Sequence, residues 1–173
     1  MTTPPTQVSP IRRRAIAIIG SFRQHYRDVL AAWATFRAAG WIITSPLGSR
    51  VIEEGIPFVR FELDDPGLDD ATVQTLALHR IMRADLTYVV APGGYVGRTT
   101  CYELGRVLQA QRPVYFSAQP ADLPLAIPVP AIASPDDVVQ RFQRTEPSAL
   151  FGGAQGTYAA WERRLCTGSY LDG

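Results

Sequence analysis

The sequence has little of several features that would point to a class of function. It holds only two cysteines, Cys101 and Cys166, so no disulfide framework is expected, and no spacing of cysteine and histidine suits zinc. Its 17 basic residues nearly match its 16 acidic ones, which argues against nucleic acid or an anionic membrane as the main partner. No apolar run approaches the roughly 20 residues of a membrane span, and the N-terminus does not resemble a secretory signal. We therefore expect a soluble, cytoplasmic protein whose main partner is neither a nucleic acid polymer nor a membrane.

The 173 residues suit one compact domain with a full core. Residues 1–13 predict a disordered tail, which leaves residues 14–173 as a single domain. A terminal helix is expected over Tyr158 to Leu165, after a break at Phe151-Gly-Gly153. The aromatic side chains of this region need a cover, which either the chain's own sheet or a second copy of the chain would supply, and we expect a homodimer or larger assembly.

Short apolar runs alternate with helical spacings along the domain, which is typical of parallel α/β proteins. Residues 45–66 are expected to form a loop with at most a short edge strand, and the two prolines in Ile127 to Ala133 allow only an edge strand there. The pattern predicts a flavodoxin-like three-layer sandwich of about five mostly parallel strands. The predicted strands are Ala15 to Ile19, Trp41 to Thr44, Leu86 to Val90 and Val114 to Ser117, and the predicted helices cover Asp28 to Ala39, Asp69 or Asp70 to about Ala84, Arg98 onward and Ser134 onward. Asp69 or Asp70 is expected to cap the second of these helices, Thr99 or Thr100 the third and Ser134 the fourth, and Leu76 is expected on the apolar face of the second.

The chain is organised around the predicted strand Leu86 to Val90, the glycine-rich turn that follows it and the helix that begins near Arg98. Ligands of parallel α/β proteins bind at the carboxyl ends of the strands, where helix N-termini favour anions. The turn is neither a P-loop nor a dinucleotide fingerprint, because the Gly-Lys-Ser/Thr ending and the glycine spacing are missing. Glu103 falls near the start of this helix, where we expect it to be partly exposed and ionised.

Two loops at this edge of the sheet supply the candidate binding residues. The glycines permit positive φ angles and a close approach of the backbone to a ligand, while arginines and hydroxyls add donors suited to a phosphate dianion. The candidates are Gly20, Ser21, Phe22, Arg23, Gly93, Gly94, Tyr95, Gly97, Arg98, Thr99 and Thr100.

The segment Tyr102-Glu103-Leu104-Gly105-Arg106 resembles the nucleoside 2-deoxyribosyltransferase family, and especially its 2-deoxynucleoside 5-phosphate N-hydrolase branch. Gly20-Ser21-Phe22-Arg23 is similar to the Gly-Ser-x-Arg of that branch, and Ala84-Asp85 matches the Ala-Asp that starts its central strand. The resemblance implies that Glu103 is the nucleophile that displaces the base from C1 of the sugar. It also makes Asp85 a candidate substrate contact, although this carboxylate could instead anchor the start of the strand.

The chain departs from that family at the groups that assist the nucleophile. The first strand offers Ala17, Ile18 and Ile19 where the family has a tyrosine, and Ala77, flanked by Gln74 and His79, stands near the family's aspartate. His79 is one candidate for proton transfer, because the pKa of histidine is close to neutral. His25 and Tyr26 are alternatives, and Cys101 is expected to be a packed side chain.

A second resemblance leads to a related reaction. Pro92-Gly-Gly-Tyr95, Gly97 and Glu103 look like part of the signature of the nucleoside-monophosphate phosphoribohydrolases, which are also described as lysine-decarboxylase-like. Both resemblances imply cleavage of an N-glycosidic bond in a small-molecule nucleoside or nucleotide, and we expect this reaction to need neither metal nor organic cofactor. A non-catalytic nucleotide-binding module is the alternative of a different class, and the missing tyrosine and aspartate favour it.

Overall fold

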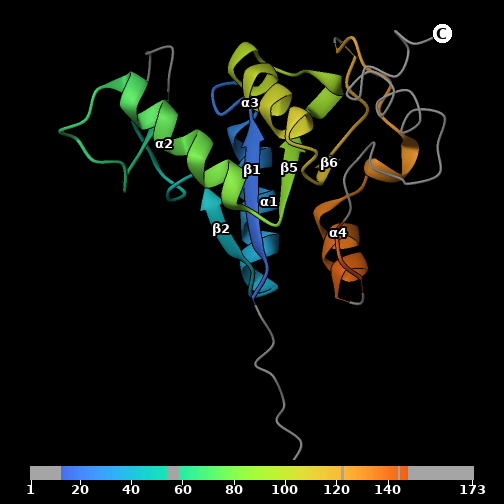
Figure 1. The fold of residues 1–173 in the computed structure, drawn as a ribbon. Helices are drawn as coiled ribbons and strands as arrows, with labels where there is room; N and C mark the ends of the chain where they lie inside the picture. The colour runs from blue at the N-terminus through green and yellow to red at the C-terminus, as the bar shows by residue number, and fades with distance from the viewer. Residues whose placement is uncertain (1–12, 54–58, 122, 144, 148–173) are drawn as a thin grey trace, which may run out of the picture.

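The computed structural model describes residues 13–53, 59–121, 123–143 and 145–147. Within them lies a parallel four-stranded sheet in the order β2-β1-β5-β6 (Figure 1). Residues 1–12 of the predicted tail, the predicted terminal helix and the aromatic residues expected to promote self-association lie outside the described residues. The strands of the sheet are β1 (Ala15–Gly20), β2 (Ile42–Ser45), β5 (Leu86–Val90) and β6 (Val114–Phe116).

Helices cover both faces of this sheet, which confirms the predicted flavodoxin-like α/β fold (Figure 1). Alternate residues along each strand enter opposite cores: Ile16 and Ile18 pack with one pair of helices, and Ala17 and Ile19 pack on the other side. On the first face lie α1 (Tyr26–Ala38) and α4 (Pro135–Phe142), and on the second lie α2 (Asp70–Arg83) and α3 (Arg98–Gln109).

The predicted caps of two helices are present. The Asp69 carboxylate accepts a hydrogen bond from the Thr72 amide at the start of α2, and Ser134 and Asp137 form a capping box at the start of α4. The predicted cap of α3 by Thr99 or Thr100 is wrong, because Gly97 occupies the N-cap and both threonines lie inside the helix. A helix start after a glycine turn leaves its first amides without a side-chain partner.

Three other details differ from the sequence-based expectations. The segment after β2 contains a separate antiparallel pair, β3 (Val51–Glu53) and β4 (Arg60–Phe61), rather than one edge strand. The region of Ile127 to Ala133 forms a 3₁₀ turn, η2 (Val129–Ala131), with a single bridge between Phe116 and Ile132. Leu76, which helical spacing places on the apolar face of α2, is 41% exposed. The main sheet therefore has four strands in the described residues, where about five were expected.

Candidate functional site

A pocket of about 700 Å³ opens at the carboxyl ends of β1 and β5, the edge of the sheet at which the sequence predicted ligand binding. Loops after these two strands, the start of α3, one face of α2 and the β2 and β4 region form its walls. Ten predicted site residues line it: Gly20, Ser21, Phe22, Arg23, Tyr95, Gly97, Arg98, Thr99, Thr100 and Glu103.

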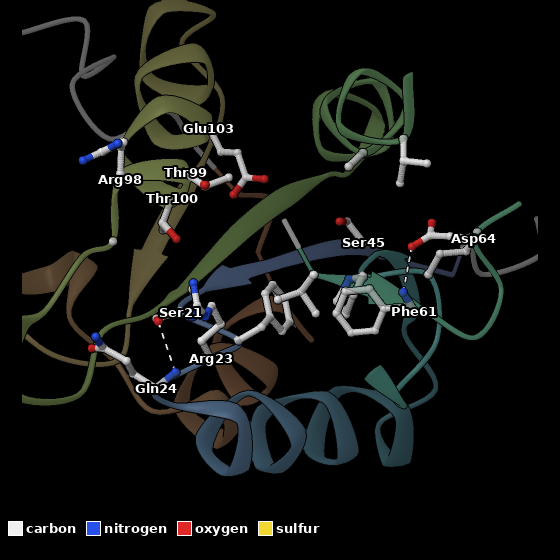
Figure 2. A pocket seen from close by; sticks show the side chains of 18 of the residues that line it. Ser21, Arg23, Gln24, Ser45, Phe61, Asp64, Arg98, Thr99, Thr100 and Glu103 are labelled. Atoms are coloured by element: carbon white, nitrogen blue, oxygen red, sulfur yellow. Dashed lines mark hydrogen bonds between the residues drawn. The ribbon is translucent and has the colours of Figure 1, made fainter. Parts of the chain in front are cut away.

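Glu103 lies in the second turn of α3, and its carboxylate points into the pocket (Figure 2). The residue is only 8% exposed, and this burial raises the pKa of its carboxyl to about 7. The expectation of a partly exposed, ionised carboxylate was therefore wrong, since the group is buried and partly protonated near neutral pH. The first turn of α3 separates Glu103 from the amides at the helix end, and desolvation outweighs the effect of the helix dipole.

Gln74 of α2 is the one side chain in the described part of the chain that bonds to Glu103. Its Nε2 donates to Glu103 Oε1 at 3.2 Å, and this bond opposes part of the rise in the pKa. In the sequence, Gln74 stands out only as a neighbour of Ala77, with no role of its own. The helical periodicity of α2 was the available signal, because it places Gln74 and the pocket-lining residues Val73 and Ala77 close together on the helix surface.

Two arginines lie at one end of the pocket. Arg23 follows β1 and Arg98 begins α3, and both are exposed. Within the described residues neither guanidinium makes a hydrogen bond or an ion pair. Ser21, Thr99 and Thr100 also line this end, and Figure 2 shows the Arg98 side chain extending away from the Glu103 carboxylate. This end of the pocket therefore carries positive charge that no described acidic group offsets.

The other end of the pocket contains residues that sequence analysis missed. Asp64 is buried, and its Oδ2 accepts a hydrogen bond from the Phe61 amide at 2.8 Å. Its Oδ1 accepts from Arg80 Nη2 at 3.4 Å. Nearby, the rings of Phe22 and Phe61 pack edge to face with their centroids 5.0 Å apart. Figure 2 shows Phe61 and Asp64 across the pocket from the arginine end.

The two glycines of the turn after β5 do not line the pocket. Gly93 and Gly94 both have positive φ, as predicted, within the short helix η1 (Pro92–Gly94). A Cβ on Gly94 would lie 2.7 Å from the Gln119 carbonyl oxygen, so this glycine serves packing against a neighbouring segment rather than contact with a ligand. Gly97 does line the pocket, but its φ is −66°, so it needs no left-handed conformation.

Two other candidates lie outside the pocket. His79 is exposed on α2 and does not line the pocket, so the structure does not bring it to Glu103 for proton transfer. Asp85 lies at the amino end of β5, where its carboxylate accepts from the Ala15 amide at 2.8 Å. It therefore anchors the strand start, at the opposite edge of the sheet from the pocket.

The two alternatives after β1 are also outside the pocket lining. The ring of His25 packs against the ring of Tyr95, with centroids 5.9 Å apart, and the Tyr26 hydroxyl donates to the Ser49 carbonyl. Cys101 is partly buried and its sulfur contacts the Val96 carbonyl, in line with the expected packed side chain.

Comparisons with models of protein families, with curated proteins and with solved structures found no match for this chain. No group of three or more potential metal ligands occurs among the described residues. The same residues include no helix long and apolar enough to cross a membrane.

Proposed function

We propose that the protein cleaves or transfers the N-glycosidic bond of a nucleoside or of its 5-monophosphate, with Glu103 as the nucleophile. The observation that carries this proposal is a buried carboxylate, with a pKa of about 7, that points into a pocket at the ligand-binding edge of a parallel sheet. The resemblance of the surrounding segment to the nucleoside 2-deoxyribosyltransferases supports the same reaction.

The reaction uses the ionised form of Glu103, which is a substantial fraction near neutral pH. An oxygen of this carboxylate bonds to C1 of the sugar while the bond from C1 to the base nitrogen breaks and its electron pair leaves with the base. The product is a glycosyl ester on Glu103. Water or a second base then attacks C1, the ester bond breaks, and the configuration at C1 is retained.

The Gln74 amide positions the nucleophile in this mechanism. Its hydrogen bond to Oε1 fixes one carboxylate oxygen and favours the charged form, so the other oxygen can face the sugar. Proton delivery to the leaving base is assigned to water, because His79 lies outside the pocket and Asp64 is held by Arg80 and the Phe61 amide.

Two other functions remain as candidates. A nucleoside-monophosphate phosphoribohydrolase would use the same pocket, and Arg23 and Arg98, which have no partner among the described residues, favour such a phosphorylated substrate. A binding module without catalysis is favoured by the apolar residues Ala17, Ile18 and Ile19, which leave Glu103 without the tyrosine that the resembling family carries.

Release of free base from a panel of nucleosides and nucleotides separates these functions. Chromatography after incubation should show base release for at least one substrate, and deoxyribosyl and ribosyl compounds in the panel distinguish the two enzyme classes. Saturable binding without base release across the whole panel would instead identify a binding module.

We also propose that the protein acts in the cytoplasm as a homodimer or larger assembly. The resembling families are oligomers with sites near subunit contacts, and this chain exposes two tyrosines, Tyr95, which lines the pocket and is 39% exposed, and Tyr102, which is 56% exposed. Sedimentation should show a species larger than the 19.0 kDa chain at micromolar concentration. A single 19.0 kDa species would contradict this part of the proposal.

A further inference from the structure

The two ends of the pocket differ in charge, with Glu103 between them (Figure 2). At one end, Arg23 and Arg98 have no acidic partner in the described part of the chain. At the other end, Arg80 is paired with Asp64, so the two charges offset each other. A dianionic group is therefore favoured at the first end and a neutral polar group at the second.

The end of the pocket that holds the Asp64–Arg80 pair, called the paired end below, offers both a hydrogen-bond donor and an acceptor. Arg80 Nη1 makes no hydrogen bond within the described residues, and it is not buried. It can therefore donate a hydrogen bond to a ligand. The Asp64 carboxylate accepts one bond at each oxygen and has lone pairs left for another donor. Together the two side chains can bind a group with an acceptor next to an N–H donor.

The same end is lined by apolar side chains, two of them aromatic. Phe22 is partly buried and Phe61 is buried, and both rings line the pocket together with Val73 and Ala77. Such a surface suits the face of a planar ring. A heterocyclic base combines a planar face with an edge that carries adjacent acceptors and donors.

We propose that the Asp64–Arg80 pair and the Phe22 and Phe61 rings form a base subsite that selects heterocycles with a hydrogen-bond acceptor beside an N–H donor. This inference rests on the proposed function, since it takes the ligand to be a nucleoside or nucleotide. The base lies at the paired end, the phosphate lies at the arginine end, and C1 of the sugar between them lies beside Glu103.

Binding measurements test this subsite without any need for turnover. Calorimetry with Glu103→Gln protein would compare adenosine, inosine, cytidine and uridine 5-monophosphates with ribose 5-phosphate, which has no base. Arg80→Lys keeps the positive charge but removes the Nη1 donor, and Asp64→Asn replaces one acceptor oxygen by a donor. Each change should weaken the best-binding nucleotide about ten- to hundredfold and ribose 5-phosphate less than about twofold.

Purine riboside 5-monophosphate adds a control, because it lacks the exocyclic group of adenosine 5-monophosphate. Asp64→Asn should therefore weaken the binding of purine riboside 5-monophosphate less than it weakens the binding of adenosine 5-monophosphate. Equal losses for nucleotide and ribose 5-phosphate, or no loss for any nucleotide, would overturn the subsite. If Asp64→Asn does not fold by circular dichroism, Arg80→Lys decides alone. Base release by the unmodified protein separately tests the proposed function, so the two can fail independently.

Discussion

Gln74 of α2 donates a hydrogen bond to Glu103 of α3, with 3.2 Å between Nε2 and Oε1. The bond joins two helices on the same face of the sheet and reaches a carboxylate that burial has pushed toward its neutral form. Since the amide N–H favours the ionised carboxylate, the Gln74 hydrogen bond increases the fraction of Glu103 that is ionised near neutral pH.

Gln74→Ala should therefore move the pH profile of kcat/KM to higher pH. Loss of the amide raises the pKa of Glu103 further, so kcat/KM at pH 7 should fall about three- to tenfold and recover at higher pH. Thr75→Ala, which changes an exposed residue of the same helix, is the matched control. An identical profile for Gln74→Ala and the unmodified protein would contradict a role for the amide.

Glu103 should also make the stability of the fold depend on pH. Its pKa is about 7 in the folded protein and near the ordinary value of 4.5 when unfolded, so the folded state holds the proton more tightly. The free energy of unfolding should fall by about 3 kcal/mol as the pH rises from about 4.5 through 7, because each pKa unit is worth about 1.36 kcal/mol.

Glu103→Gln should remove that dependence. Urea unfolding at about pH 4.5, 6 and 8 would show the variant gaining stability relative to the unmodified protein as the pH rises, while all other groups cancel in the comparison. A difference between the two proteins that stays constant over this range would show that Glu103 titrates normally.

The arginine end should distinguish a 5-monophosphate from its nucleoside. Arg23→Ala or Arg98→Ala should lower the ratio of kcat/KM for nucleotide over nucleoside about ten- to hundredfold, through loss of a charge-assisted contact. Arg27→Ala is the matched control, because Arg27 is exposed on α1 and does not line the pocket. Equal turnover of nucleotide and nucleoside by the unmodified protein would refute phosphate recognition.

The glycine turn after β5 should prove structural. Gly94→Ala forces a side chain to positive φ and into the Gln119 carbonyl, so we expect a loss of about 3 kcal/mol in the free energy of unfolding. Gly93→Ala is the matched control, with positive φ but open space, and should cost only about 1 kcal/mol. Equal losses in urea unfolding would show that the contact with Gln119 is unimportant.

The part of the site that lies in loops directly after the strands could be predicted from the sequence. Ser21, Arg23 and Thr100 come soon after predicted parallel strands, and topology alone brings such loops together. The other part depends on how α2 is rotated and where the segment after β2 folds back. Gln74 and His79 are five residues apart, which places them about 140° apart around a helix, and periodicity did not decide which one faces Glu103.

The paired end of the pocket could not be predicted from the sequence for a related reason. Asp64 follows the short antiparallel pair β3 and β4, whose residues alternate too loosely in sequence to show a register. Its burial depends on contacts with the Phe61 amide and Arg80, which only the folded chain brings together. The raised pKa of Glu103 likewise depends on how deeply the packed helices bury its carboxylate.

The most direct test of the account is to look for the sugar on Glu103. The protein would be quenched during turnover of a substrate found in the base-release panel, digested, and analysed by mass spectrometry beside Glu103→Gln. The account predicts a peptide heavier by one glycosyl group, with the adduct at Glu103, and neither adduct nor base release from the variant. Base release by Glu103→Gln at a near-normal rate would contradict the central claim.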